Sequence, residues 1–272
     1  MGGASDQKSN RYMRIIERIF FQAYVEGSRE VVFERDEITQ AAQDLGIEPP
    51  KNLGDLVYTF RYRGLLPESI RAKAPAGEEW TIRSAGKSRY RFVLATFQSL
   101  APNALLAETK VPDSTPGMVA RYALSDEQAL LARLRYNRLI DIFTGVTCYS
   151  LHNHLRTTAP AIGQIETDEV YLGIDRQGVQ YVIPVQAKGG NDKLGVVQVE
   201  QDLAMCADKF PALVCLPIAA QFMGAGLIAL LLLREQDGEI RIAMEKHYRL
   251  VPPQAITPAE LDAYRQQLVG DK

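Results

Sequence analysis

The N-terminal part of the chain places its apolar side chains at the three- and four-residue spacing of amphipathic helices. The pattern predicts helices over residues 11–24, 36–45 and 52–63. Each segment keeps its large aliphatic and aromatic residues on one side, so each helix has one face to bury. Residues 1–10 are polar and are interpreted as a loose tail before the first helix.

Two short strand-like runs follow at residues 80–83 and 89–94, with Gly86 between them. A glycine between such runs favours a tight turn, so the pattern predicts a β-hairpin. Three helices followed by a hairpin are the element order of a winged helix, whose third helix enters the major groove of DNA while the hairpin contacts the backbone. We therefore assign residues 11–96 to a winged-helix DNA-recognition domain.

The pattern changes in the second half of the chain. Residues 97–124 contain three prolines and no clear periodicity, and are interpreted as a linker. A helix is expected over residues 125–145, because Ser125 and Gln128 have the spacing of a capping box. Further along, the pattern predicts strands over residues 146–158, 168–175, 181–188, 213–219, 227–234 and 239–249, and helices over residues 194–209 and from Thr257. The order predicts an α/β (α+β) fold whose second domain, residues 125–272, has a mixed central sheet flanked by helices.

Composition narrows the class of protein. The net charge of -2 and the 46% hydrophobic content are those of a globular protein without a global basic field. The three cysteines form no CxxC pair, which argues against a disulfide scaffold or a zinc site and suits a reducing cytoplasm. No apolar run is long enough to span a bilayer, so we expect a cytoplasmic protein without a membrane segment.

Local charge supports the DNA-recognition assignment. Residues 51–95 carry nine basic and four acidic side chains, so this segment is basic although the whole chain is not. The alternative is a solvated basic face on a small structural domain. The candidate DNA contacts lie on the third helix and the hairpin: Asn52, Thr59, Arg61, Arg63, Lys87, Arg89 and Arg91.

The most informative stretch is a second hairpin whose turn is centred on Gln177. With this centre, Asp168 lies opposite Gln186 and Glu166 lies opposite Lys188. Side chains two residues apart share one face of a strand, so Asp168, Gln186 and Lys188 are expected to project together at the open end of the hairpin.

This arrangement suits metal-assisted hydrolysis of a phosphodiester. Hard divalent cations prefer oxygen ligands, which the Asp168 carboxylate, the Gln186 amide and the backbone carbonyl of Ala187 can provide. Lys188 can orient an attacking water and help to deprotonate it. The alternative is an ordinary cross-strand polar pair on an exposed face of the sheet.

At these residues the sequence resembles the PD-(D/E)xK superfamily of restriction-endonuclease-like nucleases. Asp168 matches the metal-binding Asp of the family, and Gln186-Ala187-Lys188 matches the (D/E)xK triplet. Two positions depart from the pattern, because Thr167 stands where the family has Pro and Gln186 stands where it usually has Asp or Glu. The resemblance implies a restriction-endonuclease-like domain with Mg²⁺ as its cofactor.

Gln186 leaves the triplet one negative charge short, so another carboxylate is needed. The first core helix of the family often supplies a Glu, which points to Glu127 near the start of the helix expected at residue 125. Glu166 is the second candidate, either as a ligand or as an ion-pair partner. Gln186→Glu is expected to keep or tighten metal binding, because a carboxylate is the stronger ligand for a hard cation.

The sequence therefore predicts a Mg²⁺-dependent endonuclease that cleaves double-stranded DNA, with a type II restriction enzyme as the first interpretation. Cutting both strands of a duplex generally takes two active sites, so a homodimer is expected. Two alternatives stay open. One is a repair or transposition nuclease, and the other is a DNA-binding regulator whose nuclease-like domain is inactive.

Overall fold

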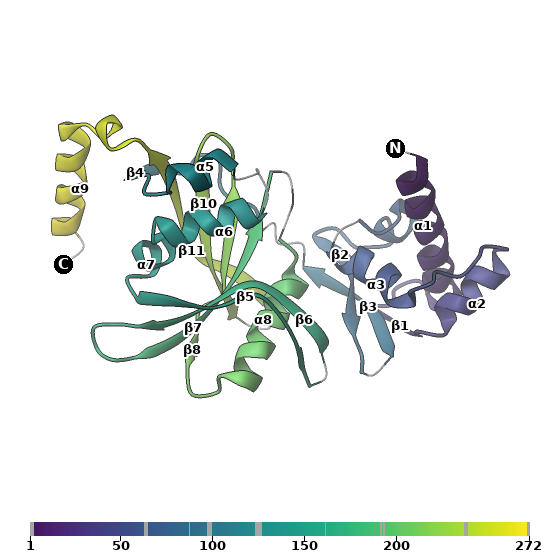
Figure 1. Cartoon of the computed structure of the whole chain (residues 1–272). Helices are drawn as coiled ribbons and strands as arrows, with labels where there is room; N and C mark the ends of the chain where they lie inside the picture. Colours follow the sequence, from purple (N-terminus) through teal and green to yellow (C-terminus); the bar gives the residue numbers. More distant parts are fainter. Residues whose placement is uncertain are drawn as a thin grey trace. The chain divides into compact units, whose positions relative to one another are not determined.

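The computed structural model describes residues 3–62, 65–86, 88–96, 100–122, 127–160, 162–190, 192, 194–236 and 239–270. The chain forms two compact units, Met1–Ser99 with Thr157–Ile165 and Leu100–Arg156 with Glu166–Lys272 (Figure 1). A large mixed sheet and a small antiparallel sheet are each flanked by helices, which confirms the expected α/β fold class.

The first unit is built on a three-stranded antiparallel sheet with the strand order β1-β3-β2. Its elements are α1 (Gly3–Ala23), β1 (Glu30–Glu34), α2 (Glu37–Asp44), α3 (Leu53–Tyr62), α4 (Glu68–Arg71), β2 (Glu78–Ser84) and β3 (Arg89–Thr96). The three helices and the hairpin expected of a winged helix are present. The expectation of a loose tail over residues 1–10 is wrong, because α1 begins at Gly3: once a helix is nucleated, it extends through polar residues at little cost.

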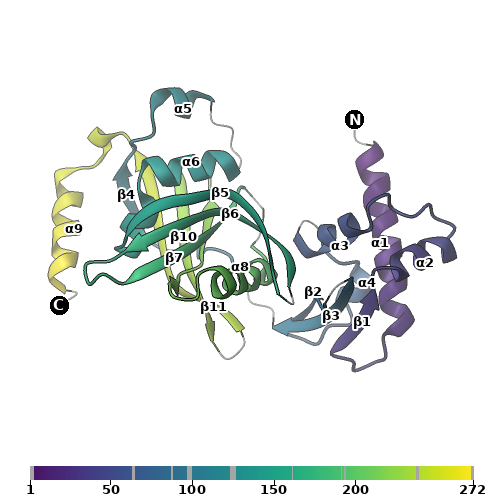
Figure 2. The ribbon, with the colours of Figure 1, turned by 60° about the horizontal axis from the view of Figure 1, so that its bottom comes forward.

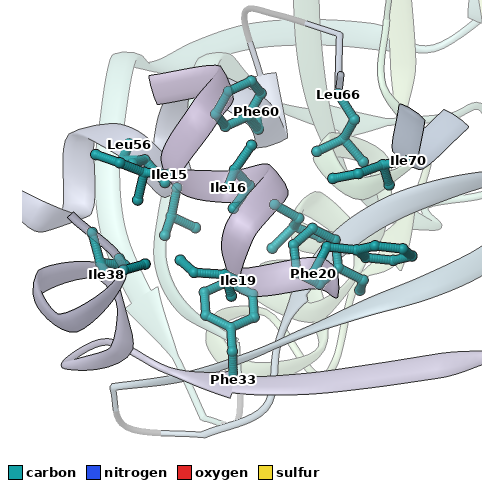
Figure 3. Packing of buried hydrophobic residues seen from close by; sticks show 14 of the residues in the cluster. Ile15, Ile16, Ile19, Phe20, Phe33, Ile38, Leu56, Phe60, Leu66 and Ile70 are labelled. Carbon is teal, nitrogen blue, oxygen red and sulfur yellow. The ribbon is translucent and has the colours of Figure 1, made fainter. Parts of the chain in front are cut away.

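The core of the first unit is centred on the apolar stripe of α1. Figure 3 shows Ile15, Ile16, Ile19 and Phe20 of this helix among side chains from α2, α3, α4 and β1. The ring of Phe20 lies 4.9, 5.0 and 5.1 Å from the rings of Tyr24, Trp80 and Phe92. These are the spacings of favourable aromatic pairs, so α1 joins the helices to the sheet. The other side chains of this cluster that Figure 3 labels are Phe33, Ile38, Leu56, Phe60, Leu66 and Ile70.

The second unit is built on an eight-stranded mixed sheet with the strand order β4-β11-β10-β9-β7-β6-β5, and β8 pairs with β7 beside this path. Pairing is parallel between β4 and β11 and where β7 meets β8 and β9; it is antiparallel between β9 and β10, β10 and β11, and β6 and β7. The elements are β4 (Glu108–Pro112), α5 (Gly117–Tyr122), α6 (Glu127–Tyr136), α7 (Leu139–Thr144), β5 (Thr147–Ala159), β6 (Gly163–Ile174), β7 (Gln180–Lys188), α8 (Val196–Lys209), β8 (Val214–Cys215), β9 (Ile218–Phe222), β10 (Leu227–Gln236), β11 (Glu239–Val251), η1 (Pro253–Ala255) and α9 (Pro258–Gly270).

Helices cover both faces of this sheet. Leu130, Leu131 and Leu134 of α6 and the buried residues of α7 pack on one face, in a cluster that reaches β5, β6, β7, β9, β10 and β11. Val199 of α8 packs on the other face with Leu231 and neighbouring residues. Figure 2 shows α6 and α8 on opposite sides of the strands. The strands between them are therefore buried on both faces. Strands of this kind have nearly continuous runs of apolar residues.

Two expectations for the second unit need correction. Residues 97–124 are not only a linker, because β4 pairs with β11 and α5 follows it. The single helix expected over residues 125–145 is broken into α6 and α7. The amide nitrogen of Asn137 donates to the Arg133 carbonyl at 3.0 Å, and its oxygen accepts from the Ser114 backbone at 2.7 Å. This side chain ties the end of α6 to a remote segment, which residue periodicity does not reveal.

Other details of the strands and caps agree with their local chemistry. The strand expected over residues 213–219 is divided into β8 and β9 at Pro217, which has no backbone N–H to donate to a ladder. At the start of α9, the backbone N–H of Thr257 donates to Glu260, and Thr257 accepts from the Glu260 backbone, so the expected capping box is confirmed. Ser125 lies outside the described residues. No described helix is long and apolar enough to cross a membrane.

We predict that Phe20→Ala lowers the free energy of unfolding of the first unit by about 3–5 kcal/mol, because it opens a cavity among four aromatic rings. Trp80 is the single tryptophan of the chain, so its fluorescence during urea denaturation reports on this unit. Phe21→Ala is the matched control, because Phe21 is 39% exposed and its loss is expected to cost clearly less. Equal losses from the two variants would contradict the packing described here.

Candidate active site

The β6–β7 hairpin has the predicted register over most of its length. The described pairs are centred on Gln177 and run as far as Glu169 opposite Val185. The ladder ends there, one pair before the predicted pair of Asp168 and Gln186. The two strands therefore part where the candidate side chains begin, and the polar groups at this end of the hairpin take other partners.

Asp168 binds the backbone of the neighbouring strand. Its Oδ2 accepts a hydrogen bond of 2.8 Å from the N–H of Ala187. This side-chain bond takes the place of a backbone ladder bond beyond the end of the described register. It holds the Asp168 carboxylate beside the Gln186-Ala187-Lys188 triplet, as the sequence predicts.

Lys188 extends from the end of β7 toward the start of α6. Its Nζ lies 3.6 Å from Oε1 of Glu127, the first residue of α6. The Lys188 side chain is only 12% exposed, whereas that of Glu127 is 43% exposed. A largely buried ammonium group requires an acidic partner, which Glu127 provides. The structure thus brings Glu127, Lys188 and Asp168 to one place from three different elements.

Glu166, the second candidate carboxylate, has different partners. Its Oε1 lies 3.0 Å from Nε2 of His154 and 3.2 Å from Nη2 of Arg156, both on β5. The described ion pairs join Glu166 to β5 and Lys188 to α6, so Glu166 and Lys188 form ion pairs with other residues rather than with each other. Between the two candidate carboxylates, Glu127 is the one that the structure places beside Lys188.

Burial and neighbouring charges shift the pKa values of the two carboxylates near Lys188, those of Asp168 and Glu127. Burial raises the pKa of Asp168, while the Ala187 N–H and the charge of Lys188 lower it. Burial also raises the pKa of Glu127; Lys188 lowers that pKa, and the negative charge of Asp168 raises it. Two acidic groups with raised pKa values beside a single lysine form a region that favours additional positive charge.

Gln186 makes contacts that the amino-acid sequence of the chain does not suggest. Its Nε2 donates to the two carboxylate oxygens of Asp202 on α8, at 3.0 and 3.2 Å, and lies 3.3 Å from the Glu166 backbone carbonyl. Thr167 Oγ1 donates to Asp202 Oδ1 at 2.6 Å. The exposed fractions of Gln186, Asp202 and Thr167 are 2%, 1% and 0%, so this network is shielded from water.

The Asp202 carboxylate is buried among neutral donors. Burial raises its pKa to about 7, and the hydrogen bonds from Thr167 and Gln186 oppose this rise without cancelling it. Sequence reasoning overlooked Asp202. A signal was present, because Val199, Asp202 and Cys206 follow one another at helical spacing, which places a carboxylate on the buried stripe of α8. An acidic residue on an apolar stripe requires an internal partner.

Two further contacts hold the elements that carry the site. Glu169 is fully buried on β6 and forms an ion pair of 2.9 Å with Arg135 of α6, which fixes the helix that begins at Glu127. Gln221 of β9 donates to the backbone carbonyls of Gly190 and Asp192, each at 3.0 Å. The loop after Lys188 is thereby attached to the neighbouring strand.

The oxygen atoms of this region suit a hard cation. The carboxylates of Asp168 and Glu127 are the charged oxygen donors, and Ala187, whose N–H binds Asp168, offers its backbone carbonyl as a further oxygen. The described side-chain hydrogen bonds of Gln186 are made through its Nε2, which leaves Oε1 as the amide oxygen that could face a cation. Within the same residues no three Asp, Glu, His or Cys side chains form a preformed metal cluster. A cation here would require amide or backbone oxygen in addition to the two carboxylates.

The candidate DNA contacts of α3 differ in availability. Asn52 is exposed, and its Oδ1 accepts from the Gly54 backbone at 3.0 Å, which supports the start of α3. Thr59 is half-buried and donates to the Asp55 carbonyl at 2.7 Å, so its hydroxyl hydrogen is already used within α3. Arg61 is half-buried.

The β2–β3 hairpin offers fewer unpaired positive charges than the number of its basic residues indicates. Arg89 is exposed at the start of β3, whereas Arg91 Nη1 lies 3.5 Å from Glu30 Oε2. Arg91 is also directly opposite Arg83 in the β2–β3 register, and such like-charge pairs are unfavourable unless an anion is near. Arg63 and Lys87, which complete the expected set, lie outside the described residues.

Comparison of the chain with protein-family models, with curated proteins and with solved structures gives no significant match.

We predict that Asp202 makes the chain less stable as the pH rises. Its pKa is near 7 in the folded protein and near 3.8 when unfolded, so the folded state holds the extra proton between these values. Folding stability is therefore lost as the pH rises from about 4 to about 7, by about 1.4 kcal/mol per pH unit at most. Asp202→Asn removes this dependence, so the variant is expected to gain stability relative to the wild type between pH 5 and pH 8.

Urea denaturation followed by circular dichroism at pH 5, 7 and 8, with a chelator present, measures this difference. Asp262→Asn provides a control of the same chemical change at an exposed position of α9. Parallel stability curves for the wild type and Asp202→Asn would show that the Asp202 carboxylate is already ionised at pH 5.

Proposed function

We propose that the chain is a Mg²⁺-dependent endonuclease that hydrolyses phosphodiester bonds in double-stranded DNA. The observation that carries this proposal is the meeting of Asp168, Lys188 and Glu127 where β6 and β7 part. Two carboxylates beside one shielded lysine are the groups that metal-assisted phosphodiester hydrolysis needs. The resemblance of the Gln186-Ala187-Lys188 stretch to the PD-(D/E)xK pattern supports the same reaction class.

Asp168, Glu127, the Gln186 amide oxygen and the Ala187 carbonyl would hold the Mg²⁺, which, when bound, lowers the pKa of the attacking water and stabilises charge on the phosphate. Lys188 would donate a hydrogen bond to that water and assist its deprotonation. The low exposure of Lys188 strengthens its interaction with charge that develops on the phosphate, because little water competes. Glu127 would keep the lysine ammonium directed toward the site.

The first unit would bind the duplex. The exposed Asn52, directly before α3, would face base edges, and Arg89 at the start of β3 would be available to phosphate. Arg61, Arg63, Lys87 and Arg91 are the remaining candidate contacts. A chain that combines target reading with cleavage fits a type II restriction enzyme, and cleavage of both strands would use a homodimer.

The second candidate is a DNA-binding regulator whose nuclease-like domain is inactive. The observation in its favour is that Gln186 contributes no negative charge and directs its nitrogen to Asp202. Plasmid cleavage in Mg²⁺ compared with chelator separates the two candidates, because only the endonuclease converts supercoiled plasmid to open or linear forms.

We predict that Lys188→Ala lowers the cleavage rate by about 10²–10³-fold, because one preorganised donor to the developing charge is lost. DNA binding measured in Ca²⁺ is expected to stay unchanged, since Lys188 acts on water rather than on the duplex. Lys246→Ala on β11 is the matched control, because Lys246 is exposed and its loss should change neither quantity. Equal cleavage by the wild type and Lys188→Ala would remove Lys188 from the mechanism.

We predict that Arg89→Glu weakens DNA binding for specific and random sequences alike. Each lost phosphate contact should also reduce the slope of log affinity against log salt by about 0.9. The full chain is titrated with labelled duplex at several salt concentrations. Arg176→Glu, the same charge reversal in the exposed β6–β7 turn, is the control. A salt slope that is equal in Arg89→Glu and the wild type would assign Arg89 no phosphate contact.

A further inference from the structure

We propose that Asp202 is a positioning residue that decides which end of the Gln186 amide is presented to the metal site. In this view Asp202 also supplies, one hydrogen bond behind Gln186, the negative charge that the glutamine lacks. The inference rests on the proposed function, because it takes the Gln186 oxygen as a metal ligand.

The orientation of the Gln186 amide follows from its neighbours. A side-chain amide has a donor nitrogen and an acceptor oxygen that diverge from one carbon. The groups beside Nε2 are both oxygens of the Asp202 carboxylate, at 3.0 and 3.2 Å, and the Glu166 carbonyl at 3.3 Å. Acceptors require the donor end of the amide, so Oε1 is directed away from Asp202.

Burial makes this orientation obligatory. Gln186, Asp202 and Thr167 are at most 2% exposed, so water cannot satisfy an amide that has turned around. A turned amide would place its oxygen against the carboxylate and leave buried acceptors without donors, which is unfavourable because water cannot replace the lost bonds. Thr167 holds the carboxylate in place by donating to Oδ1 at 2.6 Å.

The contact between Gln186 and Asp202 also compensates for the negative charge that the Gln186-Ala187-Lys188 triplet lacks. The Asp202 carboxylate, which accepts from the amide nitrogen through both oxygens, polarises the amide and makes its oxygen a stronger acceptor. In a (D/E)xK triplet the negative charge belongs to the Asp or Glu of the strand itself. In this chain Asp202 of α8 carries that charge, one hydrogen bond away from the ligand Gln186. Outer-shell partners of this kind orient metal ligands and tune their affinity.

The isosteric change Asp202→Asn tests the orientation directly. The Thr167 hydroxyl continues to donate to the remaining carbonyl oxygen, so the new amide nitrogen faces Gln186. Oδ2 is the Asp202 oxygen nearer to Nε2, so Gln186 is expected to turn its own oxygen toward the new amide nitrogen and to present its NH₂ group to the cation. An NH₂ group has no lone pair to offer a metal, so affinity is expected to fall although the fold is retained.

The reciprocal exchange is the stronger test. Gln186→Glu alone would bring a second carboxylate to hydrogen-bond distance of Asp202 with no donor between them, and the repulsion would displace it. This reverses the expectation from the sequence that Gln186→Glu keeps or tightens metal binding. In the double variant Gln186→Glu/Asp202→Asn, the introduced amide donates to the introduced carboxylate, whose second oxygen is left for the metal.

The experiment is a titration of the full chain with Mn²⁺, followed by calorimetry and by the paramagnetic resonance of the bound ion. The wild type and the control Asp208→Asn, a charge-removing change on the same helix beside Lys209, are expected to bind equally. Asp202→Asn and Gln186→Glu are each expected to weaken Mn²⁺ binding about 10–100-fold. The double variant is expected to bind nearly as tightly as the wild type.

Undiminished affinity in Asp202→Asn, or a double variant no better than the weaker single one, would overturn the inference while the proposed function stands. A wild type that binds no Mn²⁺ would instead refute the proposed function, and the positioning role with it. Circular dichroism checks the fold of each variant. If Asp202→Asn does not fold, Thr167→Val serves as the milder change: a smaller loss of affinity supports the inference and an unchanged affinity overturns it.

Discussion

The candidate site is governed by the burial of β7 on both of its faces. This strand has β6 on one side and β8 and β9 on the other, and its residues 182–187 are all buried. A polar side chain on such a strand must find partners inside the protein, because water does not reach it. Gln186 is that side chain, and the partner is Asp202 of α8. The chemistry of the strand end is therefore inseparable from the helix behind it.

The two helices that cover the sheet each attach to the same pair of strands through a charged group. On one face, Arg135 of α6 pairs with the buried Glu169, and Glu127 at the start of α6 meets Lys188. On the other face, Asp202 of α8 binds Gln186. A displacement of either helix would move one group of the candidate site, so its geometry requires both layers to be packed.

The charge of the first unit illustrates the difference between composition and surface. Several of its basic side chains are held in ion pairs: Arg29 with Glu78, Arg71 with Glu68, Lys73 with Glu26, and Arg91 with Glu30. Exposed pairs of this kind add little stability, but they reduce the field that a polyanion meets. Arg89 is exposed, and the proposed DNA interface therefore depends on fewer groups than the count of lysines and arginines indicates.

Local pattern was sufficient for α2, α3 and the buried stripe of α1, for the β6–β7 register as far as Glu169, and for the capping box at Thr257, because each follows from residues close together in the chain. Pairing of β4 with β11, the break at Asn137 and the contact of Asp202 with Gln186 join remote segments, and only the folded chain reveals them. Periodicity reports which side of an element is buried but not what packs against it. For that reason the sequence located Asp168 and Lys188, whereas the partner that orients Gln186 became visible only when α8 was placed on the sheet.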